Sequence, residues 1–337
     1  MCHICYTTDM VIISHKSALE YWRARGNVSI NNFPKLRQKY APASLPNLDE
    51  INSITSLGLS YPINLMINNQ NGKWRSRIAR PRIYTGSIPE GCIISIGEGL
   101  AVSSPEFCFF QMAGELPLVK LIELGLELSG SYSRAANSEI IKGTASEFSN
   151  GFESMDKTMY SHQQLTNVKT IKALVVRLEG VGGQKKAGRA LRFIADGSAS
   201  PMETIIFMLL TLPYRLGGYG LPMPVLNKEI HIGKATKRKS RKPTYKCDLF
   251  WPKANFAIDY DSDFYHTGAD RIAYDSKRRL DLNSIGINAF AVTSRQIRNR
   301  IEFEELASFI ARKLGKRLRY KNTKFFKASR ELRDMLL

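Results

Sequence analysis

The hydrophobic and polar positions predict a hairpin of two strands over residues 245–266, which read YKCDLFWPKANFAIDYDSDFYH. Both halves are rich in aromatic and branched residues, as is typical of largely buried strands. Between them, residues 252–255 include Pro and Asn, two common turn residues. The simplest antiparallel register across this turn pairs Trp251 with Phe256.

This register brings acidic side chains together. It places Asp248 directly opposite Asp259, and Asp261 then points to the same face as Asp259 because side chains alternate along a strand. Opposed like charges destabilise a sheet, and charge among apolar side chains is costly unless it is paired. A divalent cation explains the arrangement best, since oxygen-rich sites suit Mg²⁺ or Mn²⁺. The alternative interpretation is a set of solvated positions on an edge hairpin.

The same pattern predicts elements on both sides of the hairpin. Residues 60–110 suggest short strands, and a helix is expected to begin after Ser104. Beyond the hairpin we expect a helix over 269–284, a buried strand over 287–293, and a last helix over 303–318 that continues into a basic C-terminal tail.

A polar stretch over residues 131–160 is interpreted as a linker or an elaborated loop. We therefore expect an N-terminal α+β domain over 1–160 and a second domain over 161–337.

Another helix is predicted to begin at Ser200-Pro201, with Glu203 in its first turn. Glu203 has two interpretations. It could be the acid of a capping box, or it could project into the carboxylate cluster.

Composition indicates the class of partner. The 337 residues are 43% hydrophobic and carry a formal net charge of +19. Such an excess favours a polyanion: nucleic acid first, an anionic membrane surface second. No apolar run approaches the roughly 18 residues of a membrane span, and no signal segment is evident, so we expect a cytoplasmic protein without a membrane partner.

Two further features bear on binding. The segment 234–242 (KATKRKSRK) is strongly basic and precedes the hairpin, where it is either a solvated loop or a contact to phosphates. The five cysteines are scattered, so neither a disulfide scaffold nor a zinc site at Cys2 and Cys5 is expected. The side chains expected to contact nucleic acid are Lys237, Arg238, Lys239, Arg241, Lys242 and Arg278.

The order of motifs after residue 200 is an S-P-x-E helix, a D-L-x-W-P strand, an I-D-Y-D strand followed by Y-H, then D-x-x-R-x-x-x-L before an apolar strand. This order resembles the PD-(D/E)XK nuclease superfamily, most closely its very-short-patch-repair-like endonucleases. The resemblance implies a restriction-endonuclease-like α/β core, in which a central mixed sheet is flanked by helices. It also implies metal-dependent hydrolysis of phosphodiesters.

The resemblance also implies roles for individual residues. Asp248 and Asp259 match the two metal-binding acids, Asp261 and His266 match the polar positions that follow, and Glu203 matches the acid of the helix. Asp275 and Arg278 match the start of the later helix.

Three positions depart from the pattern: Asp259 replaces Glu, Ser262 replaces Gly, and no lysine stands at Asp261. Lys246 could supply a cation from the neighbouring strand.

The N-terminal part contains the segment AVSSPEFCFFQMA at 101–113. With a short helix before it and a β-rich middle, this part is similar to AbiEi-type antitoxins or transcriptional regulators. The similarity implies a winged-helix region that binds DNA.

The expected function is therefore Mg²⁺- or Mn²⁺-dependent endonucleolytic cleavage, of DNA rather than RNA, with a role in phage defence as an extrapolation. Asp248 and Asp259 would hold the metal, and His266 or Asp261 would act as general base or acid. The alternative is a non-catalytic DNA-binding regulator that retains a degenerate nuclease fold. A toxin-like RNase would share the metal site. The sequence does not set the oligomeric state.

Overall fold

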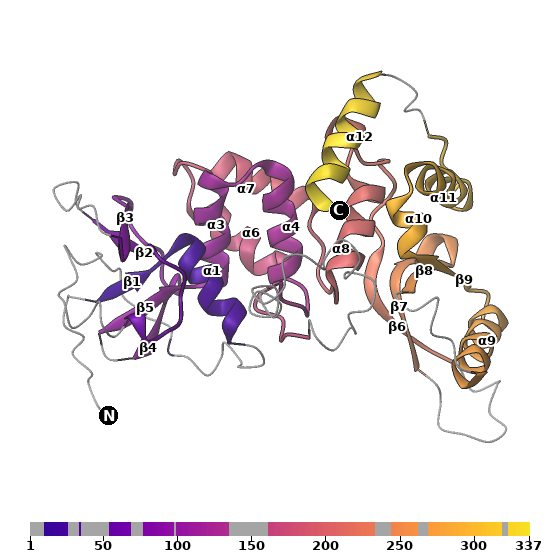
Figure 1. Cartoon of the computed structure of the whole chain (residues 1–337), viewed down its shortest axis with the longest axis horizontal. Coiled ribbons are helices and arrows are strands. Elements are labelled where there is room, and N and C mark those ends of the chain that lie inside the picture. Colours follow the sequence, from indigo (N-terminus) through magenta and orange to yellow (C-terminus); the bar gives the residue numbers. More distant parts are fainter. Residues whose placement is uncertain are drawn as a thin grey trace. The chain divides into compact units, whose positions relative to one another are not determined.

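The computed structural model describes residues 10–25, 34, 54–68, 77–97, 99–134, 161–232, 244–261, 269–318 and 323–337, with only the backbone described for 269–272. The chain divides into two compact units (Figure 1). Unit 1 draws on residues 1–129 and 162–194, and unit 2 on residues 130–161 and 195–337. Each unit contains a mixed sheet and helices, which confirms the α/β class.

Unit 1 is built on a five-stranded sheet in the order β3-β2-β1-β5-β4. β1 runs parallel to β5 and antiparallel to β2, and both β1 and β2 are buried throughout because they lie inside the sheet. The predicted winged-helix region stays a prediction, because residues 26–33 and 35–53 lie outside the described part of the chain. The strands are β1 (Val11–Ile13), β2 (Ile63–Ile67), β3 (Ala79–Ile83), β4 (Ile93–Gly97) and β5 (Leu100–Ser103).

The helices of unit 1 follow local signals in the sequence. The predicted helix start at Ser104 is confirmed, since its hydroxyl oxygen accepts the backbone N–H of Phe107 at 3.3 Å. Pro117 separates two helices within the apolar segment that follows. The helices are α1 (His15–Ala24), α3 (Pro105–Glu115), α4 (Leu118–Leu128), α6 (Val168–Arg177), α7 (Gln184–Ala190) and the 3₁₀ turn η5 (Leu191–Phe193).

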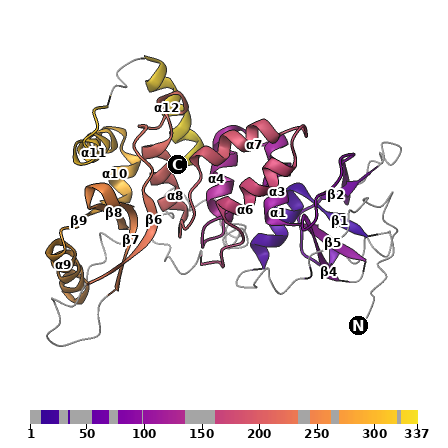
Figure 2. The ribbon, with the colours of Figure 1, turned by 180° about the vertical axis from the view of Figure 1, so that it is seen from behind.

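The boundary between the units differs from the expected division into 1–160 and 161–337. Figure 2 shows α6 and α7 beside α3 and α4, so both belong to unit 1. The buried side chains of α6, among them Ile171 and Leu174, require a neighbouring apolar surface, which α3 provides. Within the stretch interpreted as a linker, Tyr132 is part of unit 2, where its hydroxyl lies 2.8 Å from the Thr204 hydroxyl.

Unit 2 is built on a four-stranded mixed sheet in the order β6-β7-β8-β9. β6, β7 and β8 are antiparallel neighbours, and β9 runs parallel to β8. The predicted turn at 252–255 is confirmed, with Asn255 in a left-handed conformation (φ 47°). Trp251 pairs with Phe256, as the hairpin register required. The strands are β6 (Val225–His231), β7 (Thr244–Trp251), β8 (Phe256–Asp261) and β9 (Asn288–Thr293).

The strand predicted over 287–293 forms as β9, but the expectation that it is buried was wrong. β9 lies at one edge of the four described strands of this sheet, and within it only Val292 is fully buried. Phe290 is 38% exposed. The apolar run in the sequence reflects strand formation and one covered face, not burial on both faces.

Two of the helices predicted for unit 2 form where they were expected, and the helix predicted over 303–318 is shifted toward the N-terminus as α11, whereas α10 and α12 were not predicted. α9 spans the predicted range 269–284, and α8 is buried along its whole length. The helices are α8 (Pro201–Thr211), α9 (Ala269–Ser284), α10 (Ser294–Arg298), α11 (Arg300–Lys313) and α12 (Thr323–Leu336), with the 3₁₀ turns η6 (Tyr214–Leu216) and η8 (Pro252–Ala254). In the described part of the chain, none of the helices has the length and apolarity needed to cross a bilayer.

The basic C-terminal tail is largely the helix α12. Phe325, Leu332 and Leu336 recur at helical spacing and are buried, while the lysines and arginines other than the half-buried Arg333 occupy exposed positions. The ring of Phe325 lies 5.8 Å from that of Tyr214 and 5.5 Å from that of Tyr219. The sequence analysis described this segment only as a basic tail, whereas it forms an amphipathic helix that completes the core of unit 2.

Gly217 tests the docking of α12. It has φ 88°, and a Cβ added there would lie 2.2 Å from the carbonyl oxygen of Ala328 in α12. We expect Gly217→Ala to lower the free energy of unfolding by about 2–5 kcal/mol, combining left-handed strain with overpacking. Denaturant unfolding of the full chain measures this.

Gly315→Ala is the matched control, since Gly315 also has a positive φ (64°) but no atom within 4 Å of an added Cβ. In Gly315→Ala the free energy of unfolding should fall by only about 1–2 kcal/mol. Equal losses in the two variants would contradict the close contact at α12.

Candidate active site

Asp248 and Asp259 hold the two strands of the hairpin together through their side chains. Asp248 Oδ2 accepts the backbone N–H of Tyr260 at 2.8 Å, and Asp259 Oδ1 accepts the backbone N–H of Asp248 at 3.1 Å. The regular pairing of β7 with β8 ends one row earlier, at Leu249 and Ile258. At the next row, that of Asp248 and Asp259, the carboxylate oxygens accept the hydrogen bonds of backbone N–H groups. The two acids therefore lie side by side, as the hairpin register predicted.

The strand geometry is irregular at this row. Pairing of β6 with β7 skips Asn227, at the position opposite Asp248, and Asn227 has a left-handed backbone (φ 49°). Cys247 and Phe250 contribute to one buried cluster, although strict alternation would direct them to opposite faces. Such irregularities re-aim side chains and are frequent beside active sites.

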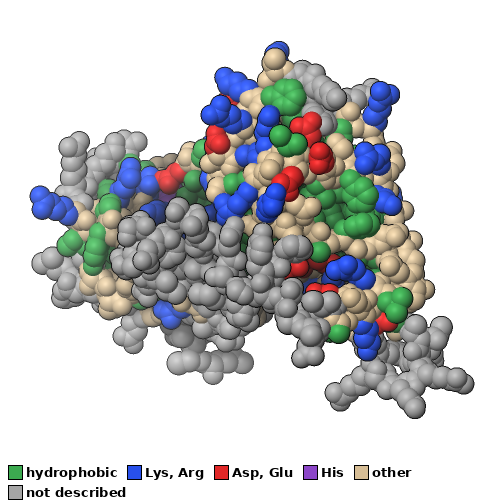
Figure 3. Space-filling model, turned by 45° about the vertical axis from the view of Figure 1, so that its right-hand side comes forward, with side chains coloured by type: hydrophobic (Ala, Val, Ile, Leu, Met, Phe, Trp, Pro, Cys, Tyr) green, Lys and Arg blue, Asp and Glu red, His purple; other side chains and the backbone are tan. Residues whose placement is uncertain are grey.

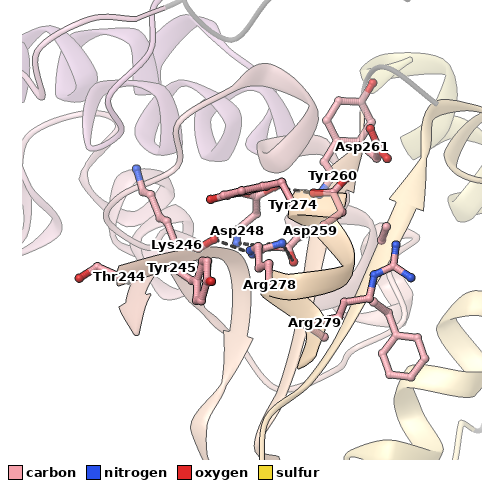
Figure 4. A pocket seen from close by; sticks show the side chains of 14 residues that line it. Thr244, Tyr245, Lys246, Asp248, Asp259, Tyr260, Asp261, Tyr274, Arg278 and Arg279 are labelled. Carbon is pink, nitrogen blue, oxygen red and sulfur yellow. Dashed lines mark hydrogen bonds and ion pairs between the residues drawn. The ribbon is translucent and has the colours of Figure 1, made fainter. Parts of the chain in front are cut away.

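The hairpin and α9 enclose a cavity of about 350 Å³ (Figure 4). The sequence-predicted residues Asp248, Asp259, Asp261 and Arg278 all line it. Figure 4 shows Asp261 further along β8 from the two paired acids. The cavity is also lined by Thr244, Tyr245, Lys246, Tyr260, Tyr274, Asp275, Arg279, Ala289, Phe290 and Ala291.

Arg278 connects α9 to the acids. Its Nη1 lies 2.9 Å from Asp259 Oδ2, and its Nη2 donates to the carbonyl oxygen of Lys246 at 2.8 Å. Burial by itself would lower the pKa of Arg278, but the hydrogen bond and the charge of Asp259 outweigh burial and raise it above its ordinary value. The guanidinium therefore stays charged, and both oxygens of Asp259 accept a hydrogen bond.

Two further groups position α9 against β7. The Tyr245 hydroxyl donates to Asp281 Oδ2 at 2.6 Å, and burial followed by this hydrogen bond raises the pKa of Tyr245 to about 12. Burial, and then the charge of Asp259, raise the pKa of the Cys247 thiol to about 12 as well. Both groups are neutral near pH 7, so Cys247 is not a reactive thiolate.

Glu203 is fully buried at the start of α8 and does not line the cavity. Its backbone N–H donates to Ser200 Oγ at 3.1 Å, and its Oε2 accepts from the Ala199 backbone N–H at 2.8 Å and from Asn227 Nδ2 at 2.5 Å. Ser200 therefore caps α8, and Glu203 binds the backbone N–H of Ala199, the residue before the cap, where the predicted capping box would use the N–H of Ser200. Through Asn227, Glu203 also fixes β6 at the row of Asp248.

Some predicted residues lie outside the described part of the chain: His266, Cys2, Cys5, Lys237, Arg238, Lys239, Arg241 and Lys242. Conversely, the sequence interpretation missed Asn227, Tyr274 and Arg279. Tyr274 and Arg279 could have been found from helical spacing. Tyr274 is four residues before the predicted Arg278, and Arg279 is four residues after the predicted Asp275, so each shares a helix face with a predicted residue. Asn227 gave no signal in the hydrophobic pattern.

The residues present fit a hard divalent cation. Asp248 and Asp259 offer carboxylate oxygens from adjacent strands, which are the donors that Mg²⁺ and Mn²⁺ prefer. Among the described residues no group of three or more His, Cys, Asp or Glu side chains is arranged to hold a metal. A cation bound to Asp259 would have to share the carboxylate with Arg278 or displace the Arg278 guanidinium from it.

Comparison with models of protein families, with curated proteins and with solved structures gave no match for this chain. Its function has to be argued from the site.

Removing the Arg278 guanidinium should strengthen cation binding. In Arg278→Ala, Asp259 Oδ2 loses its ion-pair partner and a positive charge leaves the cavity. We expect the affinity for Mn²⁺ in the absence of nucleic acid to rise about tenfold or more, given the several kcal/mol of Coulomb energy at this separation. Titration calorimetry measures it. Arg279→Ala, which removes another cation from the cavity lining, should change the affinity less, and an unchanged affinity in Arg278→Ala would contradict the competition.

Glu203→Ala should destabilise unit 2. It leaves the buried Ala199 N–H without its acceptor and removes one of the two acceptors of Asn227 Nδ2, so the free energy of unfolding should fall by about 2–3 kcal/mol. Glu203→Gln retains an acceptor oxygen and should lose less. Neither variant should alter Mn²⁺ affinity; a tenfold loss in a stably folded Glu203→Gln would instead assign this residue to the metal site.

Proposed function

We propose that this protein is a metal-dependent endonuclease that hydrolyses phosphodiester bonds of DNA. The observation that carries the proposal is the carboxylate pair, Asp248 and Asp259, in a cavity that is also lined by cationic side chains. A site for a phosphodiester needs both: oxygens that hold a divalent cation, and cations that hold the flanking phosphates. The resemblance of the motif order to the PD-(D/E)XK superfamily supports the same conclusion.

The charge of the chain supports a polyanionic substrate. The net charge is +19, and Figure 3 shows lysines and arginines over much of the visible face, with acidic side chains interspersed. Lys246, Arg278 and Arg279 also line the cavity, where they would contact the phosphates on either side of a scissile bond. Binding should therefore weaken steeply as salt is raised.

The roles of the residues follow from their positions. Asp248 and Asp259 would hold Mg²⁺ or Mn²⁺, and a bound cation would polarise the phosphate and lower the pKa of an attacking water. Arg278 would exchange its contact with Asp259 for one with a phosphate. Asp261, further along the same cavity, or His266 would move a proton to or from the reacting oxygens. A role in phage defence remains an extrapolation from the two family resemblances.

A second candidate is a non-catalytic DNA-binding regulator. The observation that favours it is the Arg278–Asp259 ion pair, which neutralises one of the two acids without a metal. In this case DNA would bind equally well in chelator, and no strand would be cleaved.

The test is incubation of labelled double-stranded DNA, single-stranded DNA and RNA with the full chain in Mg²⁺, Mn²⁺ or EDTA. We expect metal-dependent cleavage of DNA that falls roughly 100-fold or more in Asp248→Asn and in Asp259→Asn, because each removes a carboxylate from the reacting centre. Asp334→Asn removes an exposed carboxylate of α12 and should cleave normally. Salt-sensitive binding without cleavage in any metal would favour the regulator.

A further inference from the structure

Tyr274 is an exposed aromatic side chain on the wall of the carboxylate cavity. It is 58% exposed, which is high for so large an apolar ring, although it lines the same cavity as Asp248 and Asp259. Figure 4 shows it beside the two acids, on the side of the cavity formed by α9. The exposed surface of this ring is therefore available to a ligand in the cavity.

Tyr274 is supported on one side by Tyr245. Its ring meets that of Tyr245 edge to face, with centroids 6.4 Å apart and planes at 69°. Tyr245 is itself held by its hydrogen bond to Asp281 on α9. Tyr274, Arg278 and Asp281 follow helical spacing and so share one face of α9. An exposed ring therefore lies one helical turn from the guanidinium that contacts Asp259.

Phe290, the other exposed aromatic in the cavity lining, is less exposed than Tyr274, at 38%, and contacts two other rings. Its ring lies 5.5 Å from that of Phe256 and 5.1 Å from that of Phe309. Tyr274 is therefore the better platform for an external planar group. Exposed aromatic rings interleaved with cations, here Arg278 and Arg279, are the combination by which proteins bind single strands through base stacking.

Base pairing decides which substrates could use this ring. In an intact duplex both faces of every internal base are covered by its neighbours, so a side chain can stack only on a base that is unpaired, terminal or displaced. We propose that the site takes a nucleic-acid strand with an unstacked base next to the scissile phosphate, and that Tyr274 is the residue that stacks on this base. The inference rests on the proposed function and specifies its substrate class.

The experiment measures binding in EDTA, so that cleavage plays no part. Fluorescence anisotropy is recorded for a short deoxythymidine oligonucleotide, for a strand of equal length that is abasic throughout, and for a duplex of the same length. The full chain should bind the deoxythymidine strand more tightly than the duplex. Tyr274→Ala should weaken binding of that strand by about 5- to 150-fold and binding of the abasic strand by less than about twofold.

Two variants control for other effects. Tyr274→Phe keeps the ring and should retain full affinity, since stacking needs no hydroxyl. Leu280→Ala removes a 69% exposed side chain from the same helix and should change nothing, because Leu280 does not line the cavity.

An equal loss on the deoxythymidine and abasic strands in Tyr274→Ala would overturn the stacking role, and so would no loss on either. Duplex bound as tightly as the deoxythymidine strand would overturn the preference for unpaired bases. In all three cases metal-dependent cleavage could still be observed, so the proposed function would survive. If none of the three ligands binds in EDTA, the same comparison is made in Ca²⁺, because a carboxylate site can need a cation to bind phosphates; no binding there either would overturn both proposals.

Discussion

The carboxylates of Asp248 and Asp259 repel each other, and unit 2 is arranged to offset that repulsion. Each accepts a backbone N–H from the hairpin, and Arg278 adds a charged hydrogen bond from α9. Asp248 is only 5% exposed, so water contributes little to this balance. Two acids therefore join three elements: the strands β7 and β8 by hydrogen bonds, and the helix α9 by an ion pair.

Much of this arrangement could be predicted from residues alone. A short turn fixes the register of a hairpin, so Pro252 and Asn255 sufficed to pair Trp251 with Phe256 and to bring the acids together. The limits of α9 followed from its periodic pattern and Gly286. The pairing of Arg278 with Asp259 was not predicted, because periodicity gives the face of a helix and not the strand that it meets.

The remaining differences share one physical cause. An apolar face has to be covered, but the sequence does not say by which element. The sequence therefore did not predict that α6 and α7 pack in unit 1, that α12 completes the core of unit 2, or that β9 is an edge strand. Glu203 was ambiguous for a related reason: a buried acid in a first turn satisfies backbone N–H groups whether or not it also serves a site, and only its contacts with Ala199 and Asn227 decide.

The docking of α12 has a consequence for the folding of unit 2. α12 is far along the chain from α8 and from the turn at Gly217, yet it packs against both. Contacts between segments that are distant in sequence form only after a long loop has closed, and this slows folding. Neighbouring segments alone therefore do not complete the core of unit 2, and a chain truncated before Phe325 would leave the rings of Tyr214 and Tyr219 without the aromatic side chain that packs on them.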